Sequence, residues 1–256
     1  MKSLEESVVR AMDGSGTELY PFIPYICQDL WEIGSDPDVI IHLICKHCDT
    51  SNKLKVLDLG CGKGVVSIKI AQKLNFLCHG IDAIPEFIAY ARQKAIEYVV
   101  DNLCKFETGD IRKSVKILPE YDIIVLGSIG PVFGDYYSTL TTISKCLDKD
   151  GIMIIDDGYI ENGSDFFNPL MLKRDTIDQQ IKASGMQLID EQIIAKEGIK
   201  SSNKFIFEKL KIRCLELISK YPDKHQLFEN YIKKQNEENE ILENEVVCST
   251  FVIKKK

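Results

Sequence analysis

Short apolar runs alternate with longer amphipathic segments between residues 54 and 155 of this chain. A short continuous apolar run is typical of a buried strand, whereas apolar residues at every third or fourth position indicate a helix. In order, the predicted elements are strand 54–57, helix 65–74, strand 76–82, helix 85–100, strand 104–108, strand 121–126, helix 136–147 and strand 152–155. This regular alternation predicts a parallel sheet with helices packed against it.

The alternation changes after residue 155, where a loop-rich stretch of 19 residues begins. Long loops in compact domains are often functional. The elements predicted after this loop are a helix at 175–183, a strand at 186–195, helices at 204–220 and 222–242, and a strand at 246–253. A short hairpin loop would suffice to join the last two strands, so we interpret the two helices between them as an inserted helical hairpin.

Together these elements predict an α/β fold: a doubly wound, Rossmann-like, seven-stranded sheet that is mostly parallel, with strand seven antiparallel. The expected parts are an N-terminal helical cap and lid at 1–50, a Rossmann-like domain at 51–198 plus 246–256, and the inserted helical hairpin between strands six and seven at 199–245. The aromatic stretch 20–25 contains two prolines, so we expect it to be irregular.

A glycine-rich turn follows the first predicted strand, in the sequence Val56-Leu57-Asp58-Leu59-Gly60-Cys61-Gly62-Lys63-Gly64. A dinucleotide-binding turn reads G-x-G-x-x-G and places a pyrophosphate at the helix N-terminus. Here the third glycine, Gly64, comes one position early. Asp58 precedes the turn and would repel a pyrophosphate, because like charges interact strongly where water is scarce. The turn therefore favours a nucleoside that carries a positive charge, and S-adenosylmethionine (SAM) fits this description.

Acidic residues also follow the next two predicted strands. Asp82 ends the second strand, 24 residues after Asp58, and Asp110 follows the third. In a doubly wound sheet, ligands bind at the carboxyl ends of the strands, and an acid at this spacing suits ribose hydroxyls. Asp82 could instead cap the helix that begins at Pro85. Three acids at the ends of successive strands are harder to explain as caps.

The turn resembles the SAM-binding motif of class I methyltransferases, V-L-D-x-G-x-G-x-G, and the resemblance extends over residues 54–159. It implies SAM as the methyl donor and S-adenosyl-L-homocysteine (SAH) as the product. The implied cofactor contacts are Gly60, Cys61, Gly62 and Gly64 along the methionine part, Asp58 at the ammonium group or its water, Asp82 at the ribose, Ala83 and Ile111 beside the adenine, Asp110 at the adenine amino group, and Leu126, Gly127 and Ser128 near the carboxylate and sulfonium.

Methyl transfer is an in-line displacement in which alignment alone can contribute roughly 7–11 kcal/mol. A base is needed where the acceptor must lose a proton, and our catalytic candidates are Asp156, Asp157 and Tyr159, after the fifth strand. The resemblance does not extend to the substrate cover, which we expect to comprise the N-terminal segment, the loop at 156–174 and the inserted hairpin. The candidate substrate contacts are Tyr20, Tyr25, Trp31 and Pro131.

The composition limits the kinds of binding partner that we expect. The chain has 256 residues with 32 basic and 39 acidic side chains, a net charge of −7, which disfavours broad non-specific binding of nucleic acid or a membrane. Its nine cysteines are scattered through apolar segments, as in a cytoplasmic protein with reduced thiols. We expect no catalytic metal, because the stretch 127–130 supplies no carboxylate to match the acids after strand five. A monomer or a homodimer is expected.

The sequence therefore predicts a SAM-dependent methyltransferase that acts on a small-molecule acceptor, most similar to the ubiquinone- and menaquinone-biosynthesis type. Two alternatives stay open. One is a SAM-binding sensor or partner subunit without catalysis. The other, disfavoured by Asp58 and Gly64, is a dinucleotide-dependent oxidoreductase.

Overall fold

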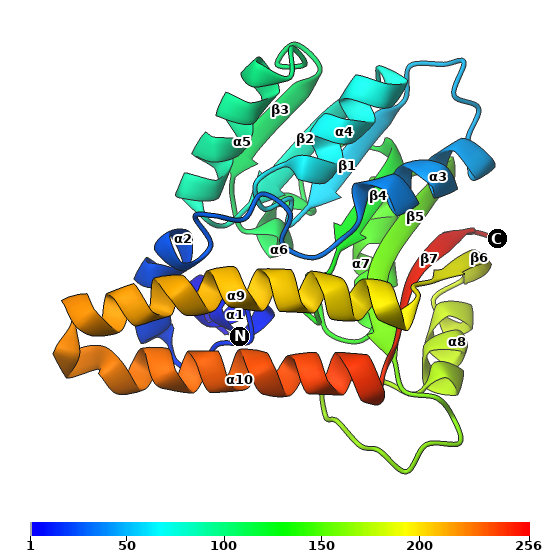
Figure 1. Ribbon diagram of the computed structural model, residues 1–256. Helices are drawn as coiled ribbons and strands as arrows, with labels where there is room; N and C mark the ends of the chain where they lie inside the picture. Colours follow the sequence, from blue (N-terminus) through cyan, green and yellow to red (C-terminus); the bar gives the residue numbers. More distant parts are fainter. Residues whose placement is uncertain (1) are drawn as a thin grey trace.

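The computed structural model describes residues 2–256 and places a seven-stranded sheet at the centre of the chain (Figure 1). The strand order is β3-β2-β1-β4-β5-β7-β6. The strands are β1 (Lys55–Leu59), β2 (Leu77–Asp82), β3 (Cys104–Thr108), β4 (Tyr121–Gly127), β5 (Leu147–Tyr159), β6 (Met186–Ile193) and β7 (Val247–Lys255). Only β7 pairs antiparallel, with both β5 and β6, among these strands. The predicted fold class, including the antiparallel seventh strand, is confirmed.

Helices cover both faces of the sheet. As a consequence, β1, β4 and most of β5 are buried on both sides. One hydrophobic core lies under α3 (Pro37–His47), α4 (Val65–Leu74) and α5 (Pro85–Glu97). A second core on the opposite face lies under α6 (Ile111–Ser114), α7 (Tyr136–Ile143) and α8 (Arg174–Ala183). A 3₁₀ turn, η2 (Ser144–Cys146), joins α7 to β5.

A third core lies outside the sheet and joins the two ends of the sequence. Side chains from the N-terminal segment pack there against the long hairpin, which crosses the front of Figure 1 in orange and yellow. The elements that form this cap are α1 (Leu4–Ala11), η1 (Thr17–Phe22), α2 (Ile23–Ile26), α9 (Lys196–Lys220), η3 (Pro222–Lys224) and α10 (His225–Asn244). Phe87, in the first turn of α5, belongs to the same core, so the cap rests on the sheet domain.

Three predicted boundaries were wrong. The stretch 20–25 is helical, since η1 and α2 cover it, and Pro24 stands in the first turn of α2, where its missing N–H costs nothing. The fifth strand begins at Leu147, through a β-bulge against β4, and leaves a shorter α7. The helix predicted at 204–220 begins at Lys196 and runs through Gly198 and Ser201, although both are weak helix formers.

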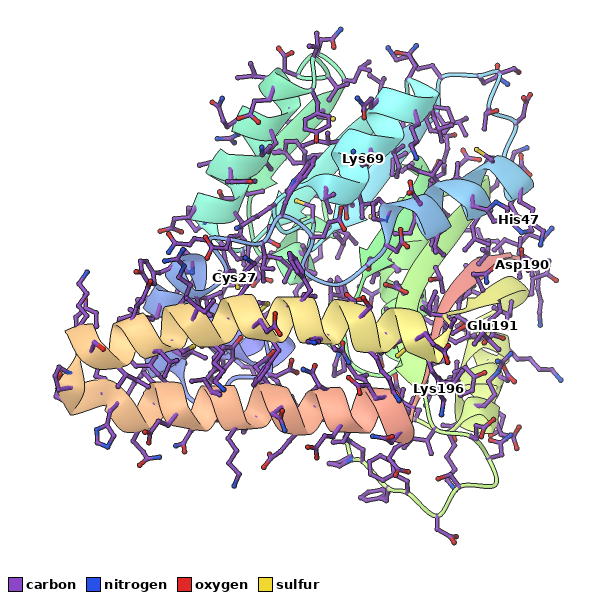
Figure 2. All side chains as sticks on the ribbon, viewed as in Figure 1. Cys27, His47, Lys69, Asp190, Glu191 and Lys196 are labelled. Carbon is purple, nitrogen blue, oxygen red and sulfur yellow. The ribbon has the colours of Figure 1, made fainter. Side chains whose placement is uncertain are left out.

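The far edge of the sheet is tied to α3. His47, at the end of α3, lies beside Asp190 of β6 (Figure 2), with His47 Nε2 2.6 Å from Asp190 Oδ2. Lys46 pairs with the same carboxylate at 2.7 Å. These two contacts hold the pKa of Asp190 well below its usual range.

Within residues 2–256 no helix combines the length and the apolar character that a membrane span needs.

Candidate functional site

A cavity that is partly open to solvent lies where the carboxyl ends of β1, β2 and β4 approach α1. Parallel pairing brings these strand ends together, because β1 pairs with β2 on one side and with β4 on the other. The predicted cofactor residues that line this cavity are Gly60, Gly62, Asp82, Ala83, Asp110, Ile111, Gly127 and Ser128. The others, Asp58, Cys61, Gly64 and Leu126, are buried and do not line it.

The glycine turn has the left-handed backbone that its sequence suggests. Gly60, Gly62 and Gly64 have φ values of 75°, 51° and 77°. A side chain at Gly64 would lie 2.8 Å from Ala91 and Phe106, so this glycine is required for packing. Gly62 is different, because no atom lies within 4 Å of the place of its missing side chain. Its backbone is therefore open to direct contact with a ligand.

Asp82 joins the glycine turn to α5. The amide of Gly62 donates to one of its carboxylate oxygens and the amide of Ile84 to the other, each at 2.9 Å. Burial raises the pKa of the Asp82 carboxyl. An ionised carboxylate has about four acceptor sites. The residue thus organises the local backbone, as the cap interpretation expects, and still has acceptor capacity for hydroxyl groups in the cavity.

Asp58 lies beneath the turn with 3% of its surface exposed. Its carboxylate accepts a hydrogen bond of 2.7 Å from the hydroxyl of Ser67. Burial raises the pKa of Asp58 to about 6, and the Ser67 hydrogen bond offsets part of this rise. A carboxylate in this position adds negative potential below the turn, which favours a cation above it.

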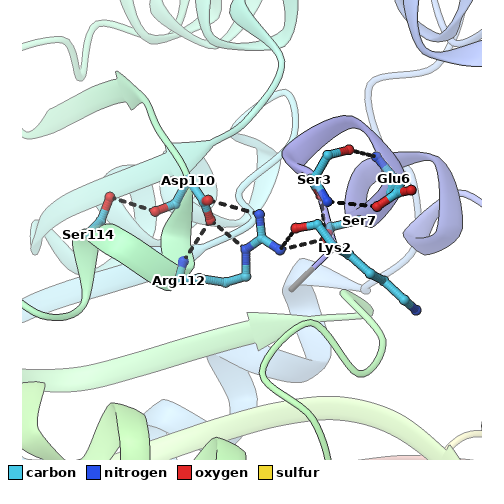
Figure 3. Close-up of polar contacts among 7 residues, drawn as sticks. All are labelled: Lys2, Ser3, Glu6, Ser7, Asp110, Arg112 and Ser114. Carbon is cyan, nitrogen blue, oxygen red and sulfur yellow. Dashed lines mark hydrogen bonds and ion pairs between the residues drawn. The ribbon is translucent and has the colours of Figure 1, made fainter. Parts of the chain in front are cut away.

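Asp110 is held by an arginine that sequence reasoning missed (Figure 3). Arg112 donates to both oxygens of Asp110, at 2.8 Å and 2.9 Å, and lowers the pKa of that carboxyl. The same guanidinium donates to the hydroxyl of Ser7 at 2.8 Å and to the carbonyl of Lys2 at 3.1 Å. Arg112 therefore connects the predicted adenine site to α1, whose Ser7 lines the cavity. The basic residue two positions after Asp110 was the signal available in the sequence.

Lys63 is a second residue that sequence reasoning missed. It stands inside the glycine turn with 4% of its surface exposed, and its ammonium donates to the carbonyls of Cys27 and Leu30. Figure 2 shows Cys27 where the N-terminal segment approaches α9. The indole of Trp31 donates to the carbonyl of Lys63 at 3.1 Å. The glycine turn and the N-terminal segment thus each donate hydrogen bonds to the other.

The three catalytic candidates lie on different sides of β5. Asp156 accepts hydrogen bonds from Ser128, at 3.0 Å, and from Thr250, at 2.8 Å. Asp157 accepts from the hydroxyl of Tyr136 at 2.9 Å. Tyr159 is buried against Phe251 and Arg174 and does not line the cavity. Of the three, Asp156 is the one that contacts a residue of the cavity wall.

The predicted substrate contacts are dispersed. The hydroxyl of Tyr20 lies 3.5 Å from the carbonyl of Ala83, near the cavity. Tyr25 donates to Glu216 of α9 at 2.7 Å and so connects two parts of the cap, whereas Trp31 donates to Lys63 of the glycine turn. Pro131 is exposed. None of these four lines the cavity as described, where Leu4, Val8 and Met12 form the wall next to Ser7. Within residues 2–256 no group of three or more metal-ligating side chains converges.

Comparison with known proteins decides the family. Residues 50–246 match the model of a methyltransferase-domain family. The chain belongs to this family. Its SAM-binding motif and its fold agree with that assignment, so the predicted membership of the class I SAM-dependent methyltransferases is confirmed.

Solved structures agree in fold with this methyltransferase-family chain. The SAM-dependent methyltransferase of Geobacter sulfurreducens in complex with SAH covers 92% of this chain and 98% of its own, with a TM-score of 0.75 and 14% identity. The SAM-dependent methyltransferase of Thiobacillus denitrificans, also with SAH, covers the same shares with a TM-score of 0.73 and 14% identity. Both structures contain SAH, and the family uses SAM as its cofactor, as predicted.

Curated relatives match over a shorter region. YqeM of Bacillus subtilis is 28% identical over 108 residues, and the malonyl-[acyl-carrier protein] O-methyltransferase of Acetivibrio thermocellus is 26% identical over 106. Each alignment covers 41% of this chain, and it covers 42% of the first relative and 36% of the second. These matches agree with the family assignment, but they do not identify the methyl acceptor of this chain.

Proposed function

We propose that this protein transfers the methyl group of SAM to a small-molecule acceptor. The observation that carries the proposal is the open backbone of Gly62 beside the carboxylate of Asp82, inside a cavity at the carboxyl ends of the strands. This cradle has room for a ligand on the main chain and an acceptor for ribose hydroxyls. The cap over the cavity and the net charge of −7 favour a small molecule over a nucleic acid.

Different residues of the chain would bind different parts of SAM. Gly60 and Gly62 would receive the methionine part, with the buried carboxylate of Asp58 below them. Asp82 would bind the ribose, and Asp110 with Ala83 and Ile111 would receive the adenine. Bound SAM supplies an activated methyl group on a sulfonium. The protein then has to align the acceptor with it and exclude water, which the apolar residues of α1 support.

The location and the assembly state are part of the same proposal. All nine cysteines are free thiols in the structure, as in a protein of a reducing compartment, and we propose a cytoplasmic location. We propose a monomer or a homodimer as the working form.

A methyl-transfer assay tests the function. The purified chain is incubated with SAM labelled in its methyl group and with fractions of small molecules from cell extract, and labelled products are separated by chromatography. We expect label to enter a discrete small-molecule product, and the Asp82→Ala variant to reduce the yield. If SAH binds tightly while every fraction stays unlabelled, the protein is a SAM-binding sensor or partner subunit.

A second candidate function is a reaction other than methyl transfer on the same fold, and one observation favours it. The [4+2]-cyclase SpnF shares the fold, with a TM-score of 0.70 at 13% identity over 98% of this chain and 95% of that one. A methyltransferase-type fold can therefore carry another activity. The label assay separates the two, because a cyclase would convert its substrate without consuming SAM.

A further inference from the structure

Ser128 occupies an unusual position in the cavity wall. It follows the last residue of β4, and it lines the cavity together with the apolar side chains of Ile33, Ile129 and Val132. Asp156, at the equivalent level of the neighbouring strand β5, is half-buried and does not line the cavity. The serine hydroxyl is thus placed between the cavity and a carboxylate.

The hydrogen bonds of this hydroxyl can be counted. A serine hydroxyl has one hydrogen to donate and two lone pairs to accept. Ser128 Oγ donates to Asp156 Oδ2 at 3.0 Å, and it also lies 3.2 Å from Ser35 Oγ. Because its hydrogen is used by Asp156, Ser35 must be the donor in the second contact. One lone pair of Ser128 is left, on an exposed residue of the cavity wall.

The backbone at Ser128 is strained, and contacts with neighbouring residues keep it in this conformation. Ser128 has φ of 54°, a left-handed conformation that is costly for a residue with a side chain. Its amide donates to the carbonyl of Asp156 at 3.0 Å. The N-terminal segment packs directly on it, because a side chain at Gly34 would lie 3.1 Å from Ser128 Cβ. Such strain tends to persist where a functional geometry depends on it.

We propose that Ser128 relays a proton from the methyl acceptor to Asp156. This inference rests on the function proposed above and names the residues that activate the acceptor. The acceptor's nucleophilic oxygen or nitrogen donates its hydrogen to the unused lone pair of Ser128 Oγ. Asp156 is the final base, and Thr250 holds its other oxygen in place at 2.8 Å.

The step balances as follows. The acceptor atom forms a bond to the methyl carbon while the bond between that carbon and sulfur breaks, and the electron pair of the broken bond stays on sulfur. The acceptor's proton moves to Ser128 Oγ, and the hydroxyl proton of Ser128 moves to Asp156 Oδ2. Asp156 ends neutral and returns this proton to solvent after the product leaves.

The relay defines the class of acceptor. A nucleophile that already lacks a proton, such as a thioether, would gain nothing from Ser128. The apolar neighbours Ile33, Ile129 and Val132 suit an apolar body around the reacting group. The geometry therefore fits an apolar small molecule that carries a hydroxyl or an N–H group.

Four variants test the relay: Ser128→Ala, Asp156→Asn, the double variant of both, and Ser184→Ala as control. Ser184 lies at the end of α8, where its hydroxyl donates to the carbonyl of Ile181. We expect each single variant to lower the single-turnover rate about 100-fold, in the range of general acid–base catalysis. The double variant should be no slower than either single variant, because the two residues act in series. The control should match the wild type.

The pH profile adds a measurement that a purely structural role would not change. Without the relay, the acceptor has to lose its proton to the medium. The rate of the variants should then rise about tenfold per pH unit below the acceptor's own pKa, more steeply than in the wild type. The relay gives Ser128 a different role from the cofactor contact that the family resemblance implies, so the Kd for SAH, measured by calorimetry, should stay within about threefold.

The outcomes distinguish this inference from the function on which it rests. If the wild type labels no small molecule, the proposed function fails, and the relay fails with it. If the wild type and Ser128→Ala share one rate and one pH profile, the relay alone is overturned. It is also overturned if Ser128→Ala weakens SAH binding more than tenfold and leaves the pH profile unchanged, because Ser128 would then be a cofactor contact. Multiplied losses in the double variant would contradict a relay in series.

Discussion

Ser128 shows a conflict between local stability and the chemistry proposed for the site. Its φ of 54° is a conformation that glycine adopts freely and that an L side chain adopts at a cost of about 1–2 kcal/mol. The hydroxyl contacts to Asp156 and Ser35 depend on this conformation. A residue chosen for stability alone would be glycine.

Two substitutions at this residue separate strain from hydrogen bonding. Both Ser128→Gly and Ser128→Ala remove the hydroxyl, but only glycine relieves the left-handed backbone. We expect Ser128→Gly to be more stable than Ser128→Ala by about 1 kcal/mol, as measured by urea denaturation. Equal stability of the two variants would mean that the backbone at 128 is not strained in solution.

Asp58 should give the protein a pH-dependent stability term. Its pKa is raised to about 6 in the fold from an unfolded value of 3.8. A raised native pKa means that the folded state holds the proton more tightly, so this contribution is fully present below about pH 4 and is lost as pH rises through 6. Between pH 7.5 and 4.5 the wild type should gain about 2 kcal/mol relative to Asp58→Asn. Parallel pH profiles of unfolding free energy for the two proteins would contradict this account of the buried carboxyl.

Among the elements, the glycine turn and the N-terminal segment depend on each other through Lys63. Its ammonium satisfies the carbonyls of Cys27 and Leu30, just beyond α2, and burial lowers the pKa of the ammonium. Removing this charged donor takes away the Lys63 partner of the Leu30 carbonyl, whereas the Cys27 carbonyl still accepts from the amide of Leu30 at 3.0 Å.

We expect Lys63→Met to lower the free energy of unfolding by about 2 kcal/mol and to speed amide hydrogen exchange in residues 23–35. Lys149→Met is the matched control, because Lys149 lies on the surface with its side chain 86% exposed. It should change stability by less than about 0.5 kcal/mol. A Lys63→Met protein as stable as this control would show that the turn and the segment are independent.

Helix α1 depends on Arg112 in a similar way. The guanidinium holds Asp110 and reaches Ser7 and the carbonyl of Lys2, so one side chain joins α1 to the predicted adenine site. Arg112→Ala should weaken SAH binding about tenfold, since hydrogen bonds to charged groups contribute roughly 1.5–3 kcal/mol. The neighbouring exposed Lys113→Ala serves as control and should leave the Kd within about twofold. Equal affinities of the two variants for SAH would leave α1 without a part in binding.

The strands were predictable from the sequence because their apolar runs are local signals. Val56 and Leu57 belong to an apolar run that is typical of a buried strand, and the glycines after them indicate the turn. The contacts of Lys63 and Arg112 were not predictable, because each joins the sheet domain to residues of the N-terminal segment far away in the chain. The start of α9 was missed because Gly198 is a weak helix former, so the local sequence did not indicate a helix there.

At the scale of the whole molecule, the elements within residues 4–26 and 196–244 form one cap. Leu19 and Ile23 pack with Leu210 and Phe228, all at most 4% exposed. The sequence predicted both the N-terminal segment and the hairpin as covers, but it contained no signal that they share a core. Such a signal is absent because long-range packing leaves no periodic pattern. A shared cap explains how α1, a marginal helix of eight residues, can form a wall of the cavity.

The central claim is that this cavity binds SAM, and a calorimetric titration of the full chain with SAH tests it most directly. We predict saturable binding at one site per chain and a Kd raised more than tenfold by Asp82→Ala, because charge-assisted hydrogen bonds contribute roughly 1.5–3 kcal/mol. NADH should give no binding heat, since Asp58 and the early Gly64 disfavour a pyrophosphate. Saturable binding of NADH together with no binding of SAH would contradict the account.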